Sequence, residues 1–300
     1  MFIENSESPI REIPFPSITV CPSSQVRKSI WDKYMDTNSS YWDDLQLYRD
    51  VMACSTNTYF HSDLEKGLNE YIDYDLIKNL LHDCRISCSE IFQSDGKWQN
   101  KTLKNVCQYI QPTILGIFGL CYTINMMPLN QMFNDEYYHR SNWNLEDGYL
   151  FYANQPNLMD MIPSRTSGVS YSHRVKLMLH SLEDDFISCA NLGIKGGSFL
   201  ITFSNPAEYC SVSPRVYILP EKYTKIQITP FVKKINSDLM WRSLEIRQCY
   251  LHNERKLSIF QQYTELNCNH ECEINKTISM CGCVMIEETC NNYFILIYTQ

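Results

Sequence analysis

Cysteine is unusually frequent in this chain, and its positions restrict the fold more than any other feature. Fourteen cysteines occur in 300 residues. Six of them fall in the last fifth of the chain: Cys249, Cys268, Cys272, Cys281, Cys283 and Cys290. Three N-glycosylation sequons accompany them, and these begin at Asn38, Asn100 and Asn275. Both features are typical of disulfide-bonded proteins of oxidising compartments, so we expect an extracellular chain.

The residues between Cys249 and Cys268 show the spacing of a helix. Leu257, Phe260 and the pair Tyr263-Thr264 recur at three-residue intervals, so they would share one helix face. The spacing predicts a helix over residues 254–267. One cysteine would tie this helix before its start, and two more would tie it at its end.

Four of the late cysteines could also be considered as zinc ligands, because thiolates bind zinc in tetrahedral sites. The set is Cys268, Cys272, Cys281 and Cys283. Their spacing lacks the two-residue separation usual in zinc sites, and the sequons argue against a cytosolic protein. We therefore expect structural disulfides, with no metal and no cofactor.

Composition and motifs exclude two functional classes. The formal net charge of −8 argues against a nucleic-acid partner, because phosphate binding requires basic surface. None of the seven histidines lies in a His-Glu-x-x-His pattern, and no Gly-x-Ser-x-Gly turn occurs. A cysteine beside His270 could serve as a thiol nucleophile, but a bridged sulfur is the better interpretation in so cysteine-rich a segment. No catalytic residue is predicted.

Membrane insertion signals are missing from the sequence. No stretch approaches the roughly 18–20 apolar residues that a membrane-spanning helix needs. The first ten residues contain Glu4 and Glu7 and no apolar core, unlike a signal peptide. A chain rich in disulfides is expected to enter the secretory pathway, so the lack of an insertion signal in this sequence is inconsistent with its cysteine content. The simplest interpretation is that this chain represents part of a longer protein.

The order of the predicted elements defines the fold class. Alternation predicts a strand within residues 9–22, a half-buried strand over 173–180 and two strands within 215–231, while helical patterns dominate from about 23 to 110. Strand, helices, several strands and a helix in that order indicate an α+β fold with a mostly antiparallel sheet.

The late cysteines belong to a longer pattern that resembles a known family. It reads Arg247-x-Cys249-x4-Glu254-x2-Leu257-x2-Phe260-x2-Tyr263-Thr264-x3-Cys268-x3-Cys272-x8-Cys281-Gly282-Cys283-x6-Cys290. This run resembles the thumb of the degenerin/epithelial sodium channel superfamily, and in particular the insect pickpocket branch of amiloride-sensitive sodium channels. Two further segments match in the expected order. One is the run 13–21 with Phe15 and Pro16, and the other is the run 119–125 with Tyr122 and Asn125, in which Ile124 replaces the usual Phe.

The resemblance implies a hand-like, disulfide-braced ectodomain with palm, β-ball, finger and thumb, in which the thumb is truncated. Its parts would be a linker and first palm strand over 1–22, a finger-like helical region over 23–110, palm and β-ball strands over 111–250, and a partial thumb over 251–300.

The resemblance also implies disulfides. Cys21 would pair with Cys121, and Cys283 would pair with Cys290. In the family, the cysteines that match Cys249, Cys268, Cys272 and Cys281 pair with partners further down the chain, and these partners are absent here. We therefore expect a poorly held thumb. Spacing does not assign partners to the remaining cysteines: Cys54, Cys84, Cys88, Cys107, Cys189 and Cys210.

Two functions from different classes follow. By resemblance, the chain is the extracellular part of a subunit of a sodium-selective, amiloride-sensitive channel of the plasma membrane. Such a subunit would assemble with others of the family as a homo- or heterotrimer and, in the complete channel, pass sodium ions. Without a pore segment, the chain alone should conduct no current. The alternative is a secreted cysteine-rich binding protein without channel activity. No residue pattern indicates a gating stimulus.

Overall fold

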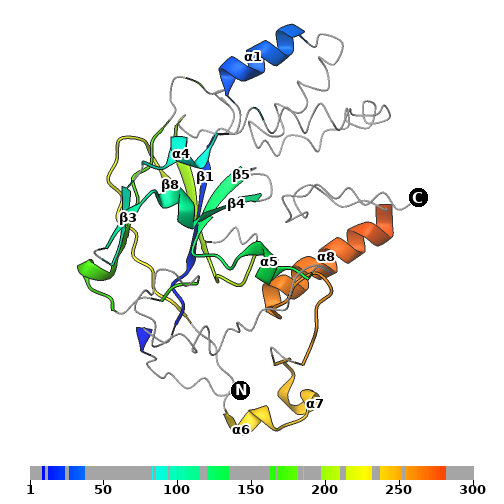
Figure 1. Ribbon diagram of the computed structural model, residues 1–300. Helices are drawn as coiled ribbons and strands as arrows, with labels where there is room; N and C mark the ends of the chain where they lie inside the picture. The colour runs from blue at the N-terminus through cyan, green and yellow to red at the C-terminus, as the bar shows by residue number, and fades with distance from the viewer. Residues whose placement is uncertain are drawn as a thin grey trace.

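Two antiparallel sheets and one long helix organise the part of the chain that the structure describes (Figure 1). The computed structural model describes residues 9–10, 13–23, 27–37, 83, 86–93, 95–99, 101–114, 120–134, 163–165, 168–181, 185, 197–209, 214–231, 237–251 and 254–281. The mixed helices and antiparallel sheets confirm the α+β class predicted from the sequence.

The larger sheet has five strands, and its central strand is the first one in the chain. Their order across the sheet is β4 (Ile110–Ile114), β5 (Leu120–Ile124), β1 (Ser17–Pro22), β7 (Phe199–Ser204) and β8 (Arg215–Ile218). β1 is antiparallel to both of its neighbours and pairs with β7 over its full length. Both faces of β1 are covered, since Thr19 and Val20 are each buried. The strand begins at Ser17 rather than earlier because Pro14 and Pro16 have no N–H to donate.

The smaller sheet has three strands, in the order β3 (Lys101–Lys104), β2 (Asp95–Trp98) and β6 (Val175–Lys176). The strand predicted over 173–180 is thus shorter than expected, with a separate bridge from Leu179 to Phe92. Its predicted alternation holds, because Val175 and Leu179 are partly buried while Lys176 and Met178 are exposed. Apolar side chains of both sheets share one core.

The helices lie around these sheets. They are α1 (Lys28–Thr37), α4 (Cys88–Ile91), η5 (Val106–Tyr109), α5 (Leu129–Met132), η9 (Tyr171–His173), α6 (Ser237–Met240), α7 (Leu244–Arg247) and α8 (Glu265–Cys281). Within the described residues, none of them is both long enough and apolar enough to cross a bilayer.

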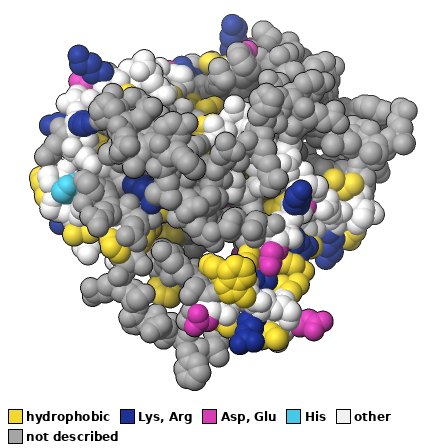
Figure 2. Space-filling model, turned by 60° about the horizontal axis from the view of Figure 1, so that its bottom comes forward, with side chains coloured by type: hydrophobic (Ala, Val, Ile, Leu, Met, Phe, Trp, Pro, Cys, Tyr) yellow, Lys and Arg dark blue, Asp and Glu magenta, His cyan; other side chains and the backbone are white. Residues whose placement is uncertain are grey.

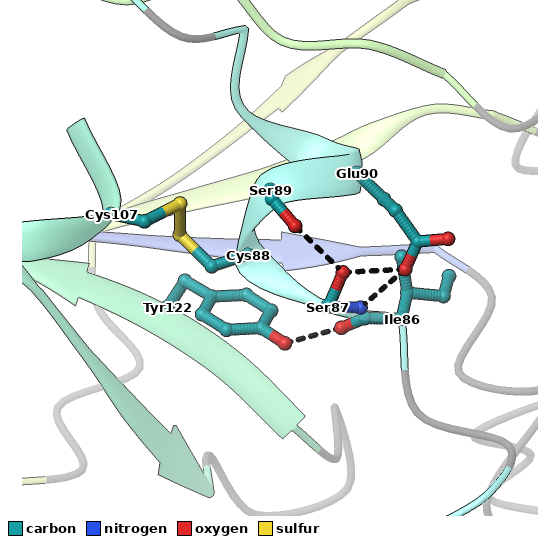
Figure 3. Close-up of a disulfide and its surroundings, with 7 residues drawn as sticks. All are labelled: Ile86, Ser87, Cys88, Ser89, Glu90, Cys107 and Tyr122. Carbon is teal, nitrogen blue, oxygen red and sulfur yellow. Dashed lines mark hydrogen bonds between the residues drawn. A yellow bond between two sulfur atoms is a disulfide. The ribbon is translucent and has the colours of Figure 1, made fainter. Parts of the chain in front are cut away.

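Two disulfides brace the described part of the chain. Cys21 on β1 is bonded to Cys121 on β5, as the resemblance implied, across a sequence separation of 100 residues. Cys88 is bonded to Cys107, a pair that spacing did not assign, and the bond ties α4 to η5 (Figure 3). The remaining cysteines of uncertain pairing, Cys54, Cys84, Cys189 and Cys210, lie outside the described residues, as do Cys283 and Cys290.

The helix predicted over 254–267 is wrong. Residues 254–264 form turns and irregular backbone, and α8 begins only at Glu265. The reason is a tertiary contact: Phe260 forms a bridge with Phe133, and the N–H of Gln261 donates to Met132 O over 2.8 Å. These bonds replace the intrahelical ones. Three-residue spacing of apolar side chains also arises in an irregular segment that buries one side.

The second strand predicted within 215–231 is also wrong. After β8, residues 219–231 are in neither a helix nor a strand. Ile226 packs against the core, but Ile228 is exposed, so the expected alternation does not produce a paired strand there. β8 is bonded to β7, and the sheet ends at β8.

Candidate functional site

The base of α8 is fastened to the five-stranded sheet by a second apolar cluster, which we call the joint. The joint brings together three segments that are distant in sequence, residues 126–134, 205–209 and 257–268. The ring of Phe133 lies 5.3 Å from that of Phe260 and 5.4 Å from that of Tyr209, measured between centroids. Figure 1 shows α5 beside the start of α8. Packing at the joint therefore connects the start of α8 to the segments that follow β5 and β7.

Directional hydrogen bonds align the 126–134 and 257–268 segments of the joint. The side-chain amide of Asn134 donates to the carbonyl oxygens of Leu257, Ser258 and Phe260 at 2.8, 3.2 and 3.0 Å. In the opposite direction, the side-chain amide of Gln261 donates to Phe133 O over 2.8 Å. Such bonds hold the 257–261 backbone in place without a helix.

The start of α8 is capped and anchored at the same place. Thr264 Oγ1 accepts from the N–H of Asn267 at 3.0 Å, which is the arrangement of a helix N-cap. The fully buried amide of Asn267 donates to Ala207 O at 3.0 Å and to Gln262 O at 3.1 Å. The N-cap residue Thr264 and the buried Asn267 together fix the position of the first turn of α8 against the segment that follows β7.

Two carboxylates hold the loops that lead into the joint. Glu271 on α8 accepts from the N–H and hydroxyl of Ser258 at 2.9 and 2.8 Å and from the N–H of Ile259 at 2.8 Å. Glu254 accepts from Arg247 Nη2 through both oxygens, at 2.6 and 2.5 Å. The Arg247 hydrogen bond, followed by one from the Leu251 N–H, lowers the pKa of Glu254 below its usual value.

Every described motif residue has a structural role. Leu257 and Phe260 are buried in the joint, Tyr263 packs against it, and Arg247 pairs with Glu254 across the loop that precedes it. These five residues were expected to mark a helix and its flank. In the structure they form the irregular segment, and the loop before it, that precede the first residue of α8.

The motif residues near the disulfides hold the sheet instead. The hydroxyl of Tyr122 donates to Ile86 O beside the Cys88–Cys107 bond (Figure 3). Asn125 adopts a left-handed conformation with φ of 61°. Its amide donates to Phe15 O, and its Oδ1 accepts from the Ser164 N–H, each over 2.5 Å. Asn tolerates this conformation better than most residues, which explains an Asn at the end of β5.

Three thiols in the described region are not in disulfides. Cys249 and Cys272 are exposed, and Cys268 is half-buried at the edge of the joint. Cys268 and Cys272 are one helical turn apart on α8, so they share a face. Among the described residues, no group of three histidine, cysteine or acidic side chains could hold a metal ion. The side chain of Cys281 and all of Cys283 lie outside that region.

Glu208 is a member of the joint that the sequence did not reveal. It lies in the turn after β7 and contacts the start of α8. Burial raises the pKa of the Glu208 carboxyl above its usual value, and the nearby charge of Glu265 acts in the same direction. Hydrogen bonds from the Thr264 hydroxyl and the Asn205 N–H oppose this shift without cancelling it. The sequence around a single acidic residue in a turn does not indicate that its carboxyl is buried or that its pKa is raised.

The first prediction concerns this carboxyl. Because the folded state raises its pKa, it binds the proton more tightly than the unfolded state does. The charged form therefore lowers stability at neutral pH, and this loss is relieved as the pH falls from the raised pKa towards the usual value near 4.5. Glu208→Gln removes the titration. We expect its melting temperature to exceed that of the unchanged protein at pH 7, with a difference that shrinks on acidification.

Glu254→Gln is the matched control for this experiment. The pKa of the Glu254 carboxyl is lowered in the folded state. The stability that this carboxylate contributes is therefore present at neutral pH and is lost only as the pH falls through the lowered pKa. This variant should therefore be the less stable one at pH 7, and the difference should persist down to pH 5. A Glu208→Gln difference that stays constant or grows as the pH falls from 7 to the usual value near 4.5 would contradict our assignment.

The fold and the joint together define a disulfide-braced sheet to which a long helix is anchored. The sequence model of the family described as "Amiloride-sensitive sodium channel" matches residues 2–296. The chain therefore belongs to the amiloride-sensitive sodium channel family, as the cysteine pattern indicated. That description names an ion channel family and not an enzyme family.

Individual relatives agree with this assignment. The chain is 22% identical over 289 residues to pickpocket protein 28 of Drosophila melanogaster, covering 91% of this chain and 44% of the relative. It is 21% identical over 296 residues to the sodium channel protein Nach of Drosophila ananassae, covering 94% and 50%. A 72-residue stretch is 32% identical to pickpocket protein 11 of Drosophila melanogaster, covering 24% and 14%. The chain thus spans half or less of the length of these relatives.

Proposed function

We propose that this chain is the extracellular part of a subunit of a sodium-selective, amiloride-sensitive channel at the plasma membrane. The observation that carries the proposal is the family match over residues 2–296, with the family's motif residues gathered at the joint and beside the disulfides. In this proposal the subunit assembles with others of the family as a homo- or heterotrimer. Sodium ions pass through a part of the complete channel that lies outside these residues.

The parts of the head receive roles in the same proposal. The five-stranded sheet is the palm with its adjoining β-ball. Its strand β1 comes from the 1–22 segment, and its other strands come from the 111–250 segment, apart from Ile110 at the start of β4. Residues 23–110 contribute the finger, and residues 251–300, including α8, begin the thumb. In this proposal, the portion of the family polypeptide that this chain does not match supplies the disulfide partners of three free thiols, Cys249, Cys268 and Cys272.

The joint supplies the mechanism. A stimulus that binds one of two arrangements of the head more tightly shifts the population towards that arrangement. Elements that move as rigid bodies about a small packed contact are a common form of such a switch. The braced sheet and α8 are two such bodies, and Phe133, Phe260 and Asn267 connect them. The joint is where a movement of the head would become a movement of the thumb.

A chimeric channel tests the proposed function. The matching part of pickpocket protein 28 is replaced by this chain, and the chimera is expressed in oocytes beside the unchanged relative. We expect the chimera to carry an amiloride-blocked sodium current, whereas the chain alone gives none. Surface biotinylation establishes that the chimera reaches the plasma membrane. A chimera that is present at the surface at the level of the relative but passes no current contradicts the proposal.

The second prediction concerns the extracellular location. Asn275 is exposed on α8 and starts a sequon, and N-glycans are added to such residues only within the secretory pathway. We expect the secreted chain to shift in mobility after treatment with peptide N-glycosidase F, with a smaller shift in Asn275→Gln. Asn269→Gln, at an exposed asparagine of the same helix outside any sequon, should change nothing. Equal mobility of Asn275→Gln and the unchanged chain would contradict this prediction.

A further inference from the structure

The outer side of the three-stranded sheet is basic, although the chain as a whole has a formal net charge of −8. Successive side chains of a strand point to opposite faces of a sheet. Trp98 on β2 and Leu103 on β3 point to the core that both sheets share. The side chains on the opposite side are exposed, and three of them are lysines: Lys97, Lys104 and Lys176. We call these three lysines, together with the neighbouring Arg174, the basic face.

The strand register brings two of the lysines together. Lys97 lies directly opposite Lys176 across β2 and β6. Side chains in such positions have Cβ atoms about 4.5–5.5 Å apart, and like charges there destabilise the sheet. Neither lysine has an ion-pair partner among the described residues. Their repulsion is therefore uncompensated within this part of the chain, and a bound anion would relieve it.

Arg174 extends the basic face along β6. Its backbone is extended, with φ of −77° and ψ of 159°, so its side chain lies on the same side as that of Lys176, two residues further on. The guanidinium is stacked on the ring of Tyr171, 3.2 Å from the centroid, and this contact holds the charge in place. Asp95, opposite Lys104, is the single acidic residue of β2, β3 and β6. Four cations therefore accompany one carboxylate.

The basic face is also held in a fixed shape. A Cβ atom at Gly96 on β2 would lie only 2.8 Å from Val106 Cγ2, so β2 packs closely against η5. The Cys88–Cys107 disulfide ties η5 in turn to α4. A ligand that binds cations on a sheet braced in this way orders little backbone, so it gains affinity from preorganisation.

The spread of the cations indicates a polymeric ligand. Neighbouring strands lie about 4.8 Å apart, and side chains two residues apart on one strand are separated by about 7 Å. A single small anion therefore reaches only some of the cations, whereas a chain with repeated negative groups reaches all of them. Dark blue Lys and Arg side chains appear along the left side of Figure 2, the side on which β3 lies in Figure 1. Clusters of this kind are typical of surfaces that bind nucleic acid or heparin.

We propose that the basic face binds a sulfated glycosaminoglycan chain of the cell surface or the extracellular matrix. The inference rests on the extracellular location in the proposed function, where sulfated polysaccharides are the abundant polyanions. The anionic lipids of a plasma membrane face the cytoplasm. The net charge of −8 repels a polyanion from the rest of the surface, so it confines the ligand to this face.

Surface plasmon resonance on the full secreted chain tests the proposal. The sequon at Asn100 lies between β2 and β3, so every protein in the test carries Asn100→Gln, which keeps an N-glycan away from the lysines. The immobilised probe is a heparin dodecasaccharide, and hyaluronan of the same length, which has carboxylates but no sulfates, is the parallel probe. We expect saturable binding to heparin and none to hyaluronan. Polyglutamate and phosphatidylserine vesicles represent an acidic peptide and a lipid surface.

Replacing the three lysines together should weaken heparin binding about ten-fold or more. The variant is Lys97→Gln/Lys104→Gln/Lys176→Gln, and its slope of log Kd against log salt concentration should fall by about 2, at roughly 0.7 for each lost contact with a flexible polyanion. Its melting temperature should not fall, because the repulsion between Lys97 and Lys176 is removed. The matched control removes the same charge from exposed lysines elsewhere and should bind normally: Lys222→Gln/Lys225→Gln/Lys256→Gln.

Three results would overturn the inference. These are no binding to heparin, an equal loss of affinity in the two triple variants, and tighter binding to polyglutamate or to the vesicles than to heparin. Current from the chimeric channel is an independent readout. A silent chimera with intact heparin binding would refute the channel function alone, and a conducting chimera without heparin binding would refute only the role of the basic face.

Discussion

Replacing Cys21 and Cys121 together with alanine is expected to lower the free energy of unfolding by about 4–5 kcal/mol, the value for closing a loop of about 100 residues. Both residues are fully buried. The register places Val20 opposite Tyr122, so the two cysteines face each other across β1 and β5. Domains are stable by only about 5–15 kcal/mol. Loss of this bond would therefore leave the sheet marginal or unfolded.

Urea unfolding followed by circular dichroism measures this effect, and the second disulfide provides the comparison. Cys88 and Cys107 are separated by only 19 residues. Their replacement by alanine should cost about 3 kcal/mol in the same entropic account. The order of the two double variants is thus a sharper test than either value. An equal or larger loss for the Cys88/Cys107 variant would contradict the role of the β1–β5 bond as the main brace.

Phe260→Ala is expected to be the most damaging single substitution in the joint, with a cost of about 3–5 kcal/mol. Phe260 is 1% exposed and lies against Phe133, so truncation leaves a cavity that the surrounding rings cannot fill. Equilibrium unfolding measures the cost. Ile246→Ala is the control, because Ile246 is 66% exposed and its truncation should change stability by less than about 0.5 kcal/mol.

Hydrogen exchange distinguishes a loosened joint from a general loss of stability. In Phe260→Ala, the amides of Asn267 and Cys268 at the start of α8 should exchange much faster, because their anchor to the sheet is weakened. The amides of β1 should keep their protection relative to global unfolding. Uniform acceleration across β1 and α8 would show that the joint is not a separate unit, and the proposed coupling would lose its physical basis.

The sequence predicted those features of the structure that depend on neighbouring residues, and it failed for those that depend on contacts between distant residues. The strand around Val20 was predictable because a short β-branched run between prolines favours only one local structure. The Cys21–Cys121 bond came from resemblance and not from spacing, since many connectivities fit fourteen cysteines. The helix expected over 254–267 failed because its apolar spacing reflects contacts with residues 132–134, which are distant in sequence. Local periodicity does not record such contacts.

The polar residues of the joint could not be predicted from the sequence for the same reason. Asn134 and Glu271 each satisfy several backbone groups, and Asn267 anchors the helix to Ala207. None of them belongs to a motif. In the sequence, a single Asn or Glu that lies in a buried network cannot be told from one on the surface. The segment 219–231 gave the opposite error. Residues 219–231 have the pattern of a strand, but the described residues supply no partner for it.

Disulfide mapping by mass spectrometry, on the secreted chain alkylated without reduction, is the most direct test of the head we describe. It should recover peptides joined through Cys21–Cys121 and through Cys88–Cys107, and it should find Cys249, Cys268 and Cys272 alkylated. Recovery of Cys21 joined to any other cysteine, or of Cys121 as a free thiol, would contradict the braced sheet on which the joint and its proposed role depend.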